Sequence, residues 1–239
     1  MVSQTPSVDL IDLAKAERDR SLPPLLFVLT VVTGLVDAVS YLKLGHVFVA
    51  NMTGNVVFLG FAVAGAQDFS ISASLLAIGA FMVGALAGGR LGSGMAEQRS
   101  RFFVIAILVK LGLVGAAFVV AIAMVDGALV RYGLIVLLAL AMGLQNAAAR
   151  FLAIPDLTTT VLTLTLTGLA ADSTLAGGNN PRAGRRLLAT GSMFLGAAVG
   201  AFLVFHIGVG AVLALTFMLL ALNAIGAYRV WSRAPSAST

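Results

Sequence analysis

Apolar residues in this chain form long runs that are separated by short polar clusters. The apolar segments lie at about residues 22–44, 47–66, 71–95, 102–125, 129–150, 154–171, 186–206 and 209–230. Because roughly 20 apolar residues are enough for a helix to cross the hydrocarbon core of a bilayer, several of these segments could span a membrane. The pattern predicts an all-α polytopic membrane protein with six to eight apolar segments.

The second and sixth apolar segments differ from the others because each opens with polar residues. Residues 51–55 read NMTGN, and residues 156–160 read DLTTT. Asn and Thr side chains cap exposed helix amides, and Gly54 permits backbone angles that other residues avoid. Each motif is typical of the start of a half-helix, so we expect both segments to be broken or re-entrant.

The two halves of the chain share a colinear pattern. Residues 34–38 (GLVDA) align with 143–147 (GLQNA), and residues 51–56 (NMTGNV) align with 156–161 (DLTTTV) after a four-residue deletion. Small residues at 79, 84, 85 and 88 then match those at 191, 196, 197 and 200. This order predicts two homologous membrane repeats, residues 22–125 and 126–231, between cytoplasmic tails at 1–21 and 232–239.

The positive charges favour one of two topologies. If every segment crosses the membrane, five Lys and Arg residues lie outside and nine inside. If the second and sixth segments do not cross, twelve are cytoplasmic and only Lys43 and Arg131 lie outside, while Lys110 sits within the fourth segment and reaches inward. The second topology agrees better with the positive-inside rule. Three full spans then separate the repeats, so the second repeat is inverted, as in many secondary transporters.

Composition supports the membrane class and removes several kinds of chemistry. Of the 239 residues, 59% are hydrophobic and 10% are charged, whereas about a quarter of a soluble domain is charged. The net charge of +5 comes from residues that flank apolar segments, so we expect no nucleic-acid partner. With no cysteine and two separated histidines, we also expect no metal site and no cofactor. The polar first 21 residues do not resemble a cleavable signal.

Asp37 is the most informative single residue. It lies about fifteen residues into the first apolar segment, where an ionised carboxylate costs a few kcal/mol unless it is paired or hydrated. One interpretation is coupling to protons or cations, or contact with a substrate. The other is a structural ion pair, for which Arg150 is the expected partner because it follows the matching residue, Asn146, by one helical turn.

The expected binding site lies between the two repeats. Half-helix amino ends that meet at mid-membrane would offer amides to an anionic or polar ligand; alternatively, the polar residues only hydrogen-bond neighbouring helices. We expect no catalytic residues. The predicted substrate- or ion-binding residues are Asp37, Tyr41, Asn51, Thr53, Gly54, Asn55, Gln145, Asn146, Arg150, Asp156, Thr158, Thr159 and Thr160.

Glycines spaced by four residues mark faces on two of the predicted helices. They are Gly84, Gly88 and Gly92 on one helix, and Gly196 and Gly200 on the other. Small residues at this spacing let helices approach closely. We expect packing within the bundle, with association of two copies of the chain through these faces as the alternative.

Parts of the sequence resemble a known family. Residues 33–42 (TGLVDAVSYL) and 48–55 (FVANMTGN) resemble the first block of the YoaK-like family of bacterial membrane proteins, and residues 143–147 and 158–163 resemble its second block. The resemblance extends from about residue 22 to 230 and implies a multi-pass membrane protein, without a substrate. We expect the bacterial cytoplasmic membrane, with both termini in the cytoplasm.

Three functions are compatible with these features. The leading one is a transporter or channel-like protein for a small polar solute or ion, because short loops leave little protein in water to do chemistry. The second is a structural or regulatory membrane protein. The third, an intramembrane enzyme, is disfavoured because Asp37 and Asp156 lie in no protease motif, and because the chain has no zinc-binding His-Glu motif.

Overall fold

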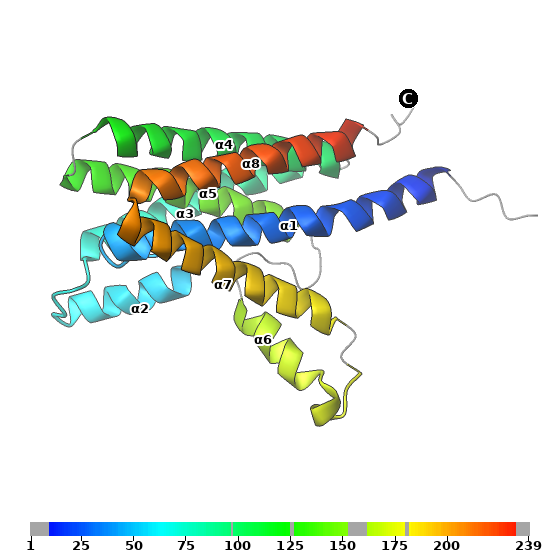
Figure 1. Ribbon diagram of the computed structural model, residues 1–239, viewed down its shortest axis with the longest axis horizontal. Helices are drawn as coiled ribbons and strands as arrows, with labels where there is room; N and C mark the ends of the chain where they lie inside the picture. The colour runs from blue at the N-terminus through cyan, green and yellow to red at the C-terminus, as the bar shows by residue number, and fades with distance from the viewer. Residues whose placement is uncertain (1–9, 97, 125–126, 153–161, 180–181, 233–239) are drawn as a thin grey trace, which may run out of the picture.

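The computed structural model describes residues 10–96, 98–124, 127–152, 162–179 and 182–232, with the backbone alone at 10–22 and 230–231. Within these ranges the regular structure is entirely helical (Figure 1). The helices are α1 (Leu10–Lys43), α2 (Met52–Val63), α3 (Ile71–Gly94), α4 (Arg99–Ala123), α5 (Ala128–Leu152), α6 (Leu162–Ala171), η1 (Thr174–Ala176), α7 (Ala183–His206) and α8 (Val209–Ser232).

Six of these helices are long and apolar enough to cross a membrane. The candidate spans are Pro23–Lys43 in α1, Ile71–Gly94, Arg99–Ala123, Ala128–Leu152, Ala183–His206, and Val209–Arg229 in α8. Their outward faces carry large apolar side chains, among them Met82, Phe194 and Phe205, that are more than half exposed. An apolar surface of this extent requires lipid in place of water. The chain is therefore an all-α polytopic membrane protein, as the sequence predicted.

Helix α2 is too short to be one of the spans. Its 12 residues extend about 18 Å, against a hydrocarbon core of about 30 Å. The loop before α2 and the loop after it also meet, because His46 Nδ1 lies 3.1 Å from the carbonyl oxygen of Asp68. Phe58 of α2 stacks on Phe69 in the second loop. The chain thus leaves α1, folds back through α2 and enters α3 from the same end of the bundle (Figure 1).

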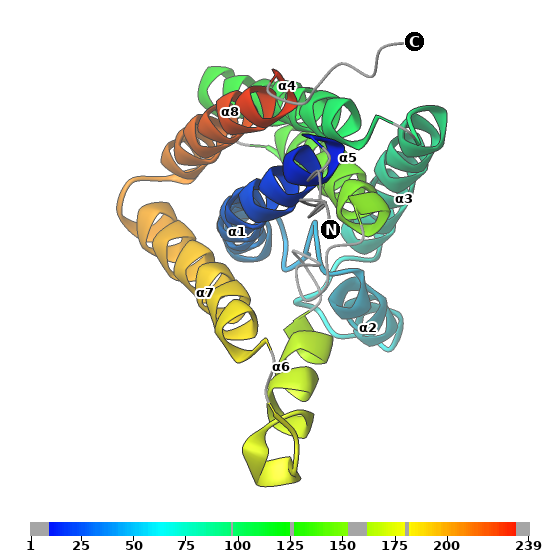
Figure 2. The same cartoon turned by 90° about the vertical axis from the view of Figure 1, so that its right-hand side faces the viewer.

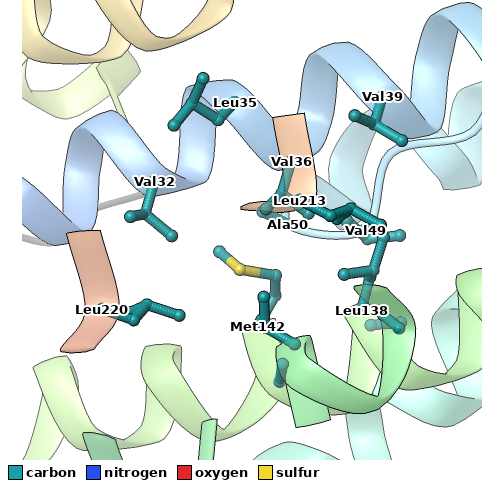
Figure 3. Packing of buried hydrophobic residues seen from close by; sticks show 14 of the residues in the cluster. Val32, Leu35, Val36, Val39, Val49, Ala50, Leu138, Met142, Leu213 and Leu220 are labelled. Atoms are coloured by element: carbon teal, nitrogen blue, oxygen red, sulfur yellow. The ribbon is translucent and has the colours of Figure 1, made fainter. Parts of the chain in front are cut away.

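Helices α1 and α5 form the centre of the molecule. Their spans are 61% and 56% buried, whereas the other four spans are between 22% and 39% buried. Figure 2 shows these two helices surrounded by α3, α4, α7 and α8, with α2 and α6 at the periphery. Where they meet, Met142 of α5 faces Val32 and Val36 of α1 (Figure 3). The same apolar cluster takes in Leu213 and Leu220 of α8.

The two halves of the chain pack in a reciprocal way. Helix α1 packs against α7 and α8, while α5 packs against α3 and α4; α2 lies on α3, and α6 lies on α7. Helices α1 and α5 run in opposite directions (Figure 1). The segments 22–125 and 126–231 are therefore not separate bodies, because the first helix of each half packs into the other half.

Glycines make the closest of these contacts. A Cβ atom added at Gly84 would overlap the backbone of Leu140 on α5, and one added at Gly196 would overlap the backbone of Val31 on α1. Gly143 and Gly34 meet α3 and α7 at the same two crossings. Backbone contact at both crossings explains why small residues are needed there.

The glycine faces consequently serve packing within one chain. Gly88 and Gly92 contact α5 residues, including Ala147 and Phe151, and Gly200 contacts Leu35 and Ala38 of α1. The expectation that Gly84, Gly88 and Gly92, or Gly196 and Gly200, could join two copies was wrong, because these faces are already covered by helices of the same chain.

Candidate functional site

Asp37 holds the chain that connects α1 to α2. Its carboxylate is buried, with the residue 5% exposed, and Oδ1 accepts hydrogen bonds from the backbone amides of Val49 at 3.2 Å and Ala50 at 3.1 Å. Its other oxygen, Oδ2, has no hydrogen-bond partner within the described ranges. Hydrogen bonds to a charged acceptor are among the stronger ones, so they offset part of the cost of placing a carboxylate in a span.

Asn55 and Gly54 shape the same connection from the side of α2. The Asn55 side chain is fully buried, accepts the Phe48 amide at 2.8 Å and donates to the Phe48 carbonyl at 2.6 Å. Gly54 has no positive φ, so the expected unusual backbone angle was wrong; a side chain there would instead collide with the Phe48 ring. Asn51 caps α2 by accepting the Gly54 amide at 3.3 Å.

These residues border a cavity of about 720 Å³. Helices α1 and α2 and the loop between them form one side, and the beginning of α6 and the middle of α7 form the other, so both halves contribute. The described lining residues are Asp37, Ala38, Tyr41, Leu42, Phe48, Asn51, Thr53, Gly54, Val57, Phe58, Leu162, Thr163, Met193, Ala197 and Ala201. Asp37 is the one charged side chain among them.

Aromatic rings gather beside Asp37. Tyr41, one turn further along α1, stacks on Phe48 with the ring centroids 5.1 Å apart, and Phe48 stacks on Phe58 at 5.7 Å. Tyr41 also lies edge-on to His46 at 5.2 Å. These contacts connect the α1–α2 loop to α2 and place three rings in the wall of the cavity.

A second polar cluster lies among α1, α4 and α5. Lys110 of α4 is 1% exposed and donates to Oε1 of Gln145. The amide nitrogen of Gln145 donates to the hydroxyl of Thr33 at 2.9 Å, and Thr33 donates to the carbonyl of Leu29. The expectation that Lys110 reaches inward to the membrane surface was wrong, because its amine is enclosed in the bundle by Gln145.

Arg150 does not pair with Asp37. It is exposed in the last turn of α5, and its neighbours Ala148 and Ala149 face Leu26 and Leu29 of α1 across a small void. Asp37 lies eight residues further along α1 than Leu29, a rise of about 12 Å. The predicted ion pair was wrong because α5 runs antiparallel to α1, which carries Arg150 toward the opposite end of the bundle.

The other predicted residues fall into three groups. Those that line the cavity are Asp37, Tyr41, Asn51, Thr53 and Gly54. Asn55 braces the loop, Gln145 belongs to the Lys110 cluster, and Asn146 donates to the Met142 carbonyl at 2.9 Å, so the structure does not bring these three into the cavity. Asp156, Thr158, Thr159 and Thr160 lie outside the described residues.

Sequence reasoning missed the aromatic part of the cavity and the partner of Lys110. Phe48 and Phe58 read as ordinary apolar residues, and the only available signal was their proximity to the polar 51–55 motif. Thr33 and Gln145 lie 112 residues apart in the sequence. Their contact could have been predicted only by placing the helices of the two halves side by side in space.

Comparisons with known proteins agree with this architecture. Residues 25–225 match a family described as Protein of unknown function (DUF1275). The chain belongs to this family. Over 150 residues the chain is also 39% identical to the UPF0700 transmembrane protein YoaK of Bacillus subtilis (strain 168).

That alignment covers 62% of this chain and 65% of the Bacillus protein, so the chain spans just under two thirds of its relative's length. No solved structure matches the chain. The resemblance inferred from residues 33–42, 48–55, 143–147 and 158–163 is thus confirmed: this is a member of the DUF1275 family, a multi-pass membrane protein.

Proposed function

We propose that this protein is a transporter or channel-like protein of the bacterial cytoplasmic membrane that moves a small polar solute or ion. The observation that supports this most is the carboxylate of Asp37, which lines a cavity of about 720 Å³ between the two halves of the chain and whose Oδ2 has no hydrogen-bond partner among the described residues. Carboxylates inside membrane bundles commonly mark ion or substrate pathways.

The arrangement of the helices supports an inverted repeat. Three candidate spans precede α5, α1 and α5 run in opposite directions, and the glycine crossing of α3 with α5 matches that of α7 with α1. Inverted repeats with short, non-spanning helices next to a site at their interface are an architecture used for alternating access. Together with the positive-inside rule, this arrangement supports a cytoplasmic position for both termini.

A structural role is the second candidate function, and the two hydrogen bonds that Oδ1 of Asp37 accepts from backbone amides favour it. In that case Asp37 only fixes the loop before α2, and the cavity carries no solute. Asp37→Asn separates the two functions, because the amide oxygen of Asn can still accept the Val49 and Ala50 amides while the charge is removed. Asp37→Ala removes both the charge and the hydrogen bonds.

The test uses purified protein in proteoliposomes on a solid-supported membrane, where rapid jumps of NaCl, KCl, ethylamine, alanine and glycerol are applied in turn and currents or volume changes are recorded. We expect at least one solute to give a response that is absent from protein-free vesicles and from Asp37→Asn, which remains monodisperse. Equal responses from the wild type and Asp37→Asn, or none from either, would contradict a transport role for Asp37.

A further inference from the structure

The hydrogen bonds around the cavity bear on the charge of its ligand. An anion would need free donors, yet the amides of Phe48, Val49, Ala50 and Gly54 are already bound to side-chain oxygens of Asn55, Asp37 and Asn51. No Lys, Arg or His is among the described lining residues. The expectation that helix amides would attract an anionic ligand therefore loses these four donors, and the one charge among the described lining residues is the carboxylate of Asp37.

The aromatic rings beside Asp37 further restrict the chemical class of the ligand. Residues four apart on a helix lie one above the other, with Cβ atoms about 5–6 Å apart, so Tyr41 and Asp37 face the same part of the cavity. Phe48 and Phe58 continue the aromatic wall. A cation within about 6 Å of a ring face is attracted by the ring quadrupole, which makes a carboxylate beside aromatic rings a common recognition pattern for ammonium groups.

The remaining features favour an organic cation over a bare metal ion. Hard metal cations are held by several oxygen ligands, whereas the described lining offers one carboxylate among mostly apolar side chains. A volume of 720 Å³ is in the range of small-molecule pockets, about 300–1,000 Å³. Asn51, Thr53 and Thr163 supply neutral oxygens that can accept further N–H groups.

We propose that the cavity binds an organic ammonium ion, with its N–H group on Oδ2 of Asp37 and its apolar part against Tyr41, Phe48 and Phe58. This inference rests on the proposed transport function and names its substrate class. The ammonium group would donate to Oδ2, which has no partner among the described residues, and its positive charge would lie beside the aromatic rings.

The experiment is equilibrium binding of radiolabelled phenethylamine to purified full-length protein in detergent at pH 7. The neutral analogue 2-phenylethanol and NaCl serve as competitors. The variants are Asp37→Asn, Tyr41→Leu and Tyr41→Phe. The matched controls are Asp68→Asn, which removes an exposed carboxylate outside the cavity, and Phe194→Leu, which removes an exposed ring on the outer face of α7.

We expect saturable binding that 2-phenylethanol does not displace. Asp37→Asn should weaken it by at least about tenfold, and Tyr41→Leu by about 2- to 30-fold. Tyr41→Phe keeps the ring and should weaken binding less than Tyr41→Leu does. Both controls should bind like the wild type. Unchanged binding in monodisperse Asp37→Asn would overturn the inference.

A second probe separates this inference from the transport proposal. If phenethylamine does not bind but ²²Na⁺ binds in a way that Asp37→Asn abolishes, the organic-cation inference is wrong and the transport proposal stands. If neither probe binds and no solute gives a current in proteoliposomes, both are wrong.

Discussion

The glycine crossings give the sharpest stability prediction. Gly84 on α3 and Gly196 on α7 occupy matching positions, and at each a Cβ atom would overlap the backbone of the central helix, at Leu140 and Val31 respectively. Gly79 and Gly191 lie five residues earlier on the same helices, and there a Cβ atom would meet nothing within 4 Å. These four positions form two matched pairs for the substitution of Gly by Ala.

The expected magnitudes follow from the contacts. All four changes gain the intrinsic helix preference of Ala, up to about 1 kcal/mol, so this contribution cancels within each pair. Overpacking costs about 1–3 kcal/mol, and the upper part of that range applies here because the obstructing atoms are backbone and cannot change rotamer. Gly84→Ala and Gly196→Ala should therefore each be about 2–3 kcal/mol less stable than Gly79→Ala and Gly191→Ala.

The assay is reversible unfolding in mixed micelles by SDS titration, followed by circular dichroism, with all four variants and the wild type in the same lipid and detergent. Similar losses of stability in Gly84→Ala and Gly196→Ala, with no loss of stability in Gly79→Ala and Gly191→Ala, would agree with reciprocal packing. Equal stability within each pair would refute the close approach of α3 to α5 and of α7 to α1.

Two polar contacts give further predictions. Gln145→Leu leaves the Lys110 amine without its hydrogen-bond partner and should lower the stability of the protein by about 1–3 kcal/mol. The double variant Gln145→Leu with Lys110→Met should have a stability within about 1 kcal/mol of the wild type, because an apolar pair can replace a buried polar one. A double-mutant cycle in the same SDS assay measures this, and additive losses would refute the pairing. Asn55→Ala removes both hydrogen bonds to the Phe48 backbone and should lower the stability of the protein by about 1–3 kcal/mol. Amide hydrogen exchange at residues 48–50 should become faster in this variant. Unchanged protection of these amides would contradict the bracing role of Asn55.

The membrane class and the short second helix could be predicted from the sequence because they depend on local features. Apolar length determines which helices can span, and the polar residues at 51–55 mark a helix start that Asn51 in fact caps. The similarity between the two halves was visible in the spacing of their small residues, and Gly84 and Gly196 both lie at close helix crossings.

The site could be predicted only in part, because it depends on contacts between distant segments. Asp37 was identified because a charged side chain within a span is energetically costly. Its hydrogen-bond partners are backbone amides, and because every residue but proline has such an amide, the sequence could not indicate which ones bind. Arg150 was assigned to it by matching positions in the two halves. That match did not take into account that α5 runs antiparallel to α1, which separates Arg150 from Asp37 along the bundle axis.

The re-entrant path of α2 can be tested by the accessibility of two single cysteines to a membrane-impermeant maleimide in intact cells. Because the chain has no cysteine, Gln67→Cys in the α2–α3 loop and Gln98→Cys in the α3–α4 loop have no background, and both positions are exposed. A re-entrant α2 predicts that Gln67→Cys is labelled from outside and Gln98→Cys only after the membrane is opened. The reverse pattern would mean that the α2 segment crosses the membrane, which would contradict the inverted repeat and the site proposed at its interface.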